Sequence, residues 1–417
     1  MAGPSTRIRI ATASPATQST RQDTLAEFAR FARSAGERKA DFLLLPEAFL
    51  GGYPRGITFG GKLGERPAGA RDEFRKYFRA AIDLGDVVGP GGAGGMGRWV
   101  RRELGGEESV EKKKAGDQGL SRGDGTREEL ERVARETGVF IVVGLVERAG
   151  GSLYCAVVYV CPQRGIIGKR RKVMPTGTER LIWAQGSPTT LKAVSITIRG
   201  IRVNLAAAIC WENYMPLLRQ SLYQQNINLY FAPTADGSDT WLSLMRTIGT
   251  EGRCFVVSSN MCVREPSATG TTKPQPRLGS TNSKEHDSLS MAIPKTRRRS
   301  VFDEDGNEIV LSGSGTGIPK LKESAAGLGS AVVEDEDVKY MTRGGSSIVS
   351  PYGEVLAGPQ WEDPHGLIYA DVDLEECVRG RLDLDTAGSY SSLNITSRND
   401  SFKLSVEGLD LDPLPYW

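Results

Sequence analysis

The sequence is poor in histidine, and this scarcity limits the chemistry that the chain can perform. Only two histidines occur in 417 residues, His286 in a Ser/Thr/Lys-rich stretch and His365 in a Pro/Gly loop. A histidine-rich zinc site is therefore nearly excluded, and a Ser-His-Asp or Cys-His arrangement is disfavoured. Any reactive nucleophile in this chain must exchange protons with a side chain other than histidine.

Paired cysteines, long apolar runs and an excess of charge are also missing. None of the six cysteines belongs to a Cys-x-x-Cys pair, and a disulfide framework would be unusual in a reducing compartment. No apolar run approaches the roughly 20 residues of a membrane span, and the N-terminal stretch lacks the apolar core of a signal peptide. The net charge of +2 gives no basic field for nucleic acid. We therefore expect a cytoplasmic globular protein that binds neither membranes nor nucleic acid.

What the sequence does contain is a regular alternation of strand-like and helix-like segments, recognised by their apolar periodicity. Strands are expected at 7–13, 41–45, 139–146, 153–161, 165–173, 191–198, 202–209, 227–231, 254–260 and 366–373, with a hairpin at 342–359. Helices are expected at 23–34, 72–82, 126–137, 215–225, 241–251 and 374–382. Thr126 is the expected cap of the third helix, with Glu129 in the capping-box position. Strand pairs interleaved with helices favour an α/β layered domain.

Two stretches differ in composition from the rest of the chain. Residues from about 85 to 125 are Gly-rich and highly charged, and residues from about 264 to 337 are rich in Ser, Thr, Gly and Lys. Because neither stretch has much to bury, we expect both to be surface insertions. The remainder of residues 1–383 is expected to form a single domain, followed by a polar C-terminal tail at 384–417.

Three predicted strands end in residues suited to covalent catalysis. Cys210 ends the apolar run VNLAAAIC, Glu47 follows LLLP directly, and Lys172 lies near the end of GIIGKRRKVMP. Open α/β sheets bind ligands at the carboxyl ends of their strands, and a nearby helix N-terminus favours a cysteine thiolate. Each residue also has an ordinary explanation: an inert core cysteine, a capping or solvated glutamate, and a solvated basic face.

Together the three side chains are compatible with one reaction. A thiolate attacks an electrophilic carbon, a carboxylate carries the proton, and an ammonium stabilises the anion that develops. The ammonium also favours the thiolate through its charge. Because the residues lie far apart in the sequence, their spacing alone does not show that they meet.

Three ordered segments resemble the sequence blocks of nitrilases in the carbon–nitrogen hydrolase superfamily. LLLPEAFLGGYPRG resembles the glutamate block, GKRRKVMPTGTERLIWAQG the lysine block, and AAAICWENYMPLLRQ the cysteine block, whose Cys-Trp-Glu-Asn form is typical of true nitrilases. The resemblance implies that Glu47 is the general base, Lys172 the stabilising ammonium and Cys210 the nucleophile. It also implies a supporting role for Glu179, for which a surface ion pair is the alternative.

Two positions depart from the pattern of the family that the chain resembles. Arg170 stands where members often have histidine, and Gly388-Ser389-Tyr390 stands in place of a Gly-His-Tyr element. Neither is a core catalytic position, so we expect the chemistry to survive and the differences to bear on assembly and substrate fit.

The resemblance also implies a fold, a reaction and an assembly. Each subunit is expected to be a two-layer αβ fold, and a dimer formed through the bare sheet face would give a four-layer αββα sandwich. Such dimers build larger homo-oligomers, including spiral filaments. The implied reaction hydrolyses a nitrile to a carboxylic acid and ammonia through a thioimidate and a thioester, with no metal or organic cofactor. Tyr53 and Trp211 flank motif residues, where they either shape the pocket or pack in the core.

Other functions remain compatible with this sequence. A nitrile or cyanide hydratase, or an amidase of the same superfamily, would release an amide or act on one. A non-catalytic oligomeric binding protein of the same fold is a second alternative. Such a protein would be expected to have lost one of the three catalytic positions, and none of them is replaced in this sequence. The loop APTADGSDTW resembles nitrilases acting on aromatic, arylaceto- and aliphatic nitriles alike, so the substrate class stays open.

Overall fold

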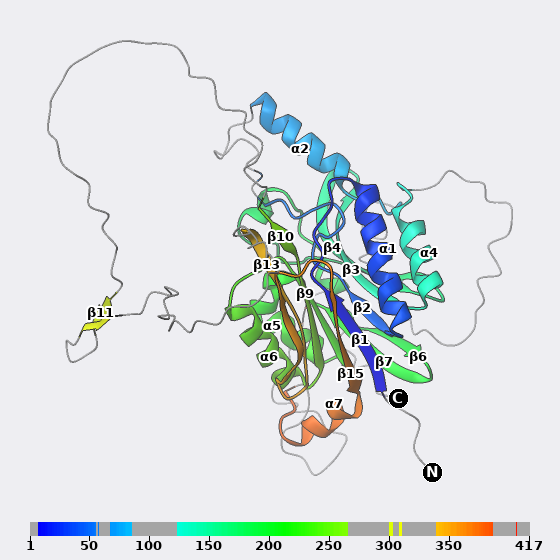
Figure 1. Cartoon of the computed structure of the whole chain (residues 1–417), viewed down its shortest axis with the longest axis vertical. Coiled ribbons are helices and arrows are strands. Elements are labelled where there is room, and N and C mark those ends of the chain that lie inside the picture. Colours follow the sequence, from blue (N-terminus) through cyan, green and yellow to red (C-terminus); the bar gives the residue numbers. More distant parts are fainter. Residues whose placement is uncertain are drawn as a thin grey trace, which may run out of the picture. The chain divides into compact units, whose positions relative to one another are not determined.

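The computed structural model describes residues 7–55, 57, 67–85, 123–265, 300–302, 308–310, 339–386 and 406 (Figure 1). The chain divides into two compact units, and the second, residues 266–337, is described only as a hairpin of β11 (Ser300–Phe302) and β12 (Glu308–Val310). Every predicted catalytic residue belongs to the first unit. The predicted insertions at about 85–125 and 264–337, the tail at 384–417 and the Gly388-Ser389-Tyr390 element lie wholly or largely outside the described residues and stay predictions.

The first unit contains two β-sheets. The first sheet has the strand order β15 (Leu367–Asp373), β1 (Arg7–Ala13), β2 (Phe42–Leu44), β3 (Phe140–Ala149), β4 (Ser152–Cys161) and β5 (Gly165–Arg171). The second has the order β10 (Cys262–Arg264), β13 (Tyr340–Val349), β9 (Phe255–Asn260), β8 (Leu229–Thr234), β7 (Ile201–Ala207) and β6 (Val194–Ile198), with β14 (Val355–Trp361) paired to β13. Each sheet has three parallel strands at its centre, β1-β2-β3 and β7-β8-β9.

The helices connect these strands and cover the sheets. They are α1 (Arg21–Glu37), α2 (Ala68–Ala80), α4 (Thr126–Thr137), α5 (Pro216–Tyr223), α6 (Thr240–Gly252) and α7 (Glu375–Arg379). The 3-10 turns within the described residues are η2 (Gly177–Leu181), η3 (Pro188–Thr190), η4 (Cys210–Tyr214) and η5 (Gly380–Leu382). None of the helices in the described part of the chain combines the length and the apolar character of a transmembrane span.

The two sheets pack face to face within one chain, so the predicted two-layer subunit is wrong. A central core joins apolar residues of both sheets, with the rings of Phe42 and Phe231 6.3 Å apart, and Thr12 Oγ1 donates across to the carbonyl oxygen of Ser258 at 3.0 Å. Helices α1 and α4, which lie side by side in Figure 1, cover the outer face of the first sheet, and α5 and α6 cover the second. The four αββα layers therefore need no partner.

The error has a physical cause. The central strands carry apolar residues on both faces, as in β3, where Val142 enters the core between the sheets and Val143 the core beneath the helices. Such a pattern demands that both faces be covered, but it does not say whether the same chain or a second copy covers them. Because the supposed bare face is already covered, the argument for a dimer through that face fails, and oligomerisation stays a prediction.

The α/β class and most of the expected elements are confirmed. The strand at 7–13 and the helix at 126–137 have the expected bounds. The expected cap of that helix is wrong, because Gly125 occupies the capping position and Thr126 is the first helical residue. The Asp124 carboxylate accepts the Thr126 N–H at 3.0 Å, and Glu129 pairs with Arg132 instead of closing a capping box.

Candidate active site

Four of the predicted site residues meet in a buried cluster between the ends of the strands. Glu47 follows β2, Lys172 follows β5, Glu179 lies in η2, and Cys210 begins η4 after β7. Lys172 Nζ lies 2.8 Å from Glu47 Oε1 and 2.8 Å from Glu179 Oε2. The Cys210 sulfur and one oxygen of each glutamate all lie within 4.8 Å of one another. Positions separated by more than a hundred residues therefore form one site.

The turn that carries Glu47 depends on a close approach of the backbone to β3. A Cβ atom at Gly144 would lie 2.2 Å from the carbonyl oxygen of Pro46 and 2.6 Å from the Cα of Glu47, so only glycine allows this contact. The next residue, Ala48, has a φ of 50°, a left-handed conformation that costs energy for a residue with a Cβ. The local backbone is thus shaped to turn the Glu47 carboxylate into the site.

The Cys210 backbone is strained in a similar way. Its φ is 54°, and such non-glycine outliers are often found at functional sites, held by the surrounding structure. Asn213 Nδ2 helps to hold this turn by donating to the carbonyl oxygens of Ala208 and Cys210 at 2.9 and 2.7 Å. Thr234 Oγ1, at the end of β8, lies 3.2 Å from the Cys210 sulfur.

The environment of Cys210 favours the neutral thiol at rest. Burial raises the pKa of this thiol well above its ordinary value, and the nearby Glu47 carboxylate raises it further, while Lys172 only partly offsets them. The expected stabilisation by a helix N-terminus is not found, because Cys210 starts a short 3-10 turn and α5 begins only at Pro216. The thiol therefore needs a base in order to ionise.

The surroundings of Glu47 suit it to act as a base, and those of Lys172 suit it to remain a cation. Burial raises the pKa of Glu47 above its ordinary value, although the Lys172 ammonium opposes this shift. Burial also opposes the charge of Lys172, but Glu47 and the other acidic groups around it keep its pKa well above the ordinary lysine value. Lys172 therefore stays protonated, while Glu47 gains basicity relative to an exposed carboxylate.

The Glu179 carboxylate is held by several donors besides Lys172. Tyr53 Oη donates to Glu179 Oε1 at 2.8 Å, and the Thr176 backbone N–H donates to Oε2 at 2.8 Å. The alternative expectation for Glu179, a surface ion pair, is excluded because the side chain is buried. Trp183 packs edge-on against Tyr53, with ring centroids 5.5 Å apart. Trp183 has no role in the sequence-based prediction, although it lies within the lysine block.

Trp211 does not join the buried cluster. Its side chain is half-exposed, and its indole N–H donates to Asp236 Oδ2 at 3.0 Å. Tyr214 packs edge-on against it, with ring centroids 5.9 Å apart. Core packing, one of the two expectations for Trp211, is therefore excluded.

Glu212 has a role that the sequence-based prediction missed. Its Oε1 accepts the Val173 N–H at 2.6 Å, and its Oε2 accepts the Ile209 N–H at 2.8 Å. These two backbone groups lie next to Lys172 and Cys210, so one buried carboxylate fastens together the chain segments that carry these two residues. The Cys-Trp-Glu-Asn sequence could have indicated this role, because a glutamate that follows a buried apolar strand must find hydrogen-bond or charge partners if it is buried too.

The carboxylates of Glu47 and Glu179 and the Cys210 sulfur also form a set that could ligate a metal ion. Lys172 Nζ already contacts both carboxylates, so an ammonium supplies the cation that balances them.

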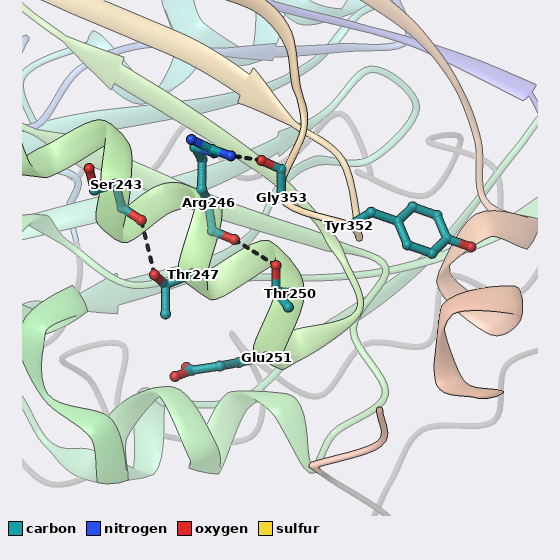
Figure 2. A pocket seen from close by; sticks show the side chains of 7 residues that line it. All are labelled: Ser243, Arg246, Thr247, Thr250, Glu251, Tyr352 and Gly353. Atoms are coloured by element: carbon teal, nitrogen blue, oxygen red, sulfur yellow. Dashed lines mark hydrogen bonds between the residues drawn. The ribbon is translucent and has the colours of Figure 1, made fainter. Parts of the chain in front are cut away.

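A surface pocket of about 390 Å³ lies apart from this cluster, between α6 and the turn that follows β13 (Figure 2). Its Arg246 Nε donates to the Gly353 carbonyl oxygen at 2.8 Å, and no member of the buried cluster lines it.

The αββα sandwich and its buried cluster of a cysteine, a lysine and two glutamates agree with the class that the sequence resembles, the carbon–nitrogen hydrolases. The sequence pattern of the carbon–nitrogen hydrolase family matches residues 7–381. The chain therefore belongs to the carbon–nitrogen hydrolase family, within its nitrilase group.

Individual relatives support this assignment. An arylacetonitrilase of Trametes versicolor is 34% identical over 392 residues, which cover 92% of this chain and 91% of the relative. A bifunctional nitrilase/nitrile hydratase of Nicotiana tabacum is 33% identical over 377 residues, covering 90% of this chain and 80% of the relative. The solved structure of Saccharomyces cerevisiae Nit3, of the nitrilase superfamily, has a TM-score of 0.52 at 14% identity, covering 92% of this chain and 96% of that one. This last likeness concerns the fold alone.

Proposed function

We propose that this enzyme is a nitrilase that hydrolyses an organic nitrile to the carboxylic acid and ammonia through covalent intermediates on Cys210. The observation that carries the proposal is the Lys172 ammonium, which lies 2.8 Å from both carboxylates beside a buried thiol. The names of the relatives, an arylacetonitrilase and a bifunctional nitrilase/nitrile hydratase, support a nitrile as the substrate.

In the first step, Glu47 accepts the thiol proton of Cys210 while the sulfur adds to the nitrile carbon. The proton passes from Glu47 to the nitrile nitrogen, which gives a neutral thioimidate. Because the pKa values of the Cys210 thiol and of Glu47 are both raised by burial, proton transfer coupled to attack avoids an isolated thiolate in a buried site.

In the second step, Glu47 activates a water molecule that adds to the thioimidate carbon. The Lys172 ammonium stabilises the negative charge that develops in the tetrahedral intermediate. The nitrogen takes up the proton and leaves as ammonia, which produces a thioester. A second water attacks this thioester, releases the carboxylic acid and restores the Cys210 thiol.

Glu179 and Tyr53 act through Lys172 in this scheme. Glu179 contacts the Lys172 ammonium through both oxygens, at 3.0 and 2.8 Å, and the Tyr53 hydroxyl holds one of these oxygens. They therefore orient the cation and exchange no proton with the substrate. Trp211 and Tyr53 remain our candidates for contact with the substrate.

A hydratase is the second candidate, favoured by the relative that is named as bifunctional. If the tetrahedral intermediate expels the Cys210 sulfur instead of ammonia, the product is the amide. An amidase, which would begin from that amide, uses the same residues. The third alternative, a binding protein without catalysis, is opposed by the complete set of buried groups that the reaction needs.

The test is turnover of about a dozen nitriles of differing size, with acid, amide and ammonia all quantified. We expect acid and ammonia in equal amounts, and complete loss of both in Cys210→Ala with the fold retained. The matched control is Cys161→Ala, which removes another buried thiol that contacts Gln163. Substantial turnover by Cys210→Ala would overturn the mechanism, and amide as the sole product would identify a hydratase.

We further propose a cytoplasmic location and assembly into homo-oligomers. The location is supported by the cysteines, because all six lie in the described residues, are buried and form no disulfide. Light scattering of the purified full chain tests the assembly, and a monomer at all concentrations would contradict it.

A further inference from the structure

A second buried cysteine lies against the proposed general base. Cys155, in β4, is fully buried, and its sulfur lies 3.3 Å from Glu47 Oε1. Its backbone carbonyl oxygen accepts the Lys172 N–H at 2.7 Å. The Cys155 side chain therefore contacts Glu47, and its backbone contacts the backbone of Lys172. The reaction proposed above nevertheless gives Cys155 no role.

The contacts of Glu47 are unequal between its two oxygens. Oε1 receives both the Lys172 ammonium, at 2.8 Å, and the Cys155 thiol. Oε2 is buried, and none of the described residues donates a hydrogen bond to it. A buried carboxylate oxygen without a partner is costly in a folded protein, and its lone pairs are free to accept a proton.

Cys155 itself is kept as a neutral donor. Burial raises the pKa of its thiol well above the ordinary value, and the Glu47 carboxylate adds to this effect. A thiol that does not ionise can only donate its S–H to the charged oxygen, and it donates weakly. The contact thus fixes the orientation of the carboxylate at a small cost in basicity.

We propose that Cys155 is a positioning residue that holds Glu47 so that Oε2 is the oxygen that accepts the proton from Cys210. This inference rests on the proposed function, because it assigns a partner to its general base. The groups that face Glu47 are Lys172, Glu179, Cys210, Cys155 and, at longer range, Tyr53 and Tyr77. Of these, Lys172 and Cys155 donate hydrogen bonds to Oε1, and hydrogen bonding with the Cys210 side chain also acts to lower the pKa of Glu47.

The experiment compares Cys155→Ala and Cys155→Ser in the full-length enzyme, with Cys161→Ser as the matched control at the end of the same strand. Alanine removes the donor, so ionised Glu47 is less stabilised and the acidic limb of the kcat/KM profile moves to higher pH, by about half a unit. Serine is a stronger donor, so it should move the limb to lower pH and keep kcat within a few-fold of the parent. Cys161→Ser should leave the limb in place.

A second readout separates this inference from the proposed function. The rate at which iodoacetamide alkylates Cys210, followed by mass spectrometry against pH, reports on the same base without any nitrile. We expect its pH dependence to move in the same two directions in the Cys155 variants. If the alkylation profile moves but no nitrile is hydrolysed, the positioning role stands and the proposed function fails. An unmoved acidic limb and alkylation profile in Cys155→Ala, even with lowered stability, would overturn the inference by reducing Cys155 to core packing.

Discussion

Arg170 Nη1 donates a hydrogen bond of 2.6 Å to Glu212 Oε2, and both side chains are almost fully shielded from solvent. This ion pair joins the end of β5, just before Lys172, to the turn that carries Cys210. Burial alone would raise the pKa of Glu212, but the Arg170 charge and the Ile209 N–H together hold it below the ordinary range. Arginine at this position therefore gives a pair that stays charged at any working pH.

Glu212→Gln should strongly destabilise the enzyme and reduce its activity. The amide leaves Arg170 buried without a counter-charge, and breaking a buried pair in this way costs about 3–5 kcal/mol. Denaturant unfolding measures the stability, and kcat measures the effect on the nucleophile. The control is Glu129→Gln, whose partner Arg132 lies on an exposed helix surface and whose loss should cost roughly 0–1 kcal/mol. Equal losses in the two variants would contradict the role of Glu212.

Lys172→Arg should reduce kcat/KM by about 100-fold or more, even though the charge is kept. A lysine ammonium is compact and meets oxygens of both Glu47 and Glu179, whereas a planar guanidinium requires a different geometry. Initial rates on any accepted nitrile measure the effect. Lys169→Arg is the control, because this lysine is also buried but pairs with Glu147 at 2.6 Å. Normal rates in Lys172→Arg would show that another basic residue serves the reaction.

Gly144→Ala should displace the general base. The added Cβ would meet the Pro46 carbonyl oxygen at 2.2 Å, so the turn that carries Glu47 must move. We expect a loss of stability of about 1–3 kcal/mol, as for other overpacked sites, together with a fall in kcat. Gly151→Ala is the control, since a Cβ there meets nothing within 4 Å. Full activity in Gly144→Ala would contradict the close packing of the Glu47 turn.

The acidic limb of kcat/KM should lie above the ordinary glutamate pKa of about 4.3. Burial raises the pKa of Glu47, and below that pKa the protonated carboxyl cannot accept the Cys210 proton, so activity falls as the pH decreases. Burial also raises the pKa of the Cys210 thiol, so its ionisation should produce no basic limb below about pH 9. Rates measured between pH 4 and pH 10 decide both points, and a limb at or below the ordinary value would contradict the first.

The sequence by itself predicted which groups react and determined much of the local structure. Two histidines in the whole chain required a base of another kind, and the three motifs predict roles for Glu47, Lys172 and Cys210. Local periodicity was sufficient for β1 and α4, because the spacing of apolar residues along a strand or helix is a property of neighbouring residues.

Only the tertiary structure decided how these parts come together. Strands that are apolar on both faces do not specify what covers them. The sequence therefore predicted that a partner subunit covers the inner face of the sheet, where the structure has a second sheet of the same chain. The neutral state of Cys210 depends on burial and on the charge of Glu47, and neither is encoded in the local sequence. Cys155 and Glu212 have partners far away in the chain. Their roles follow from contacts over a few ångströms in space, which no spacing along the sequence expresses.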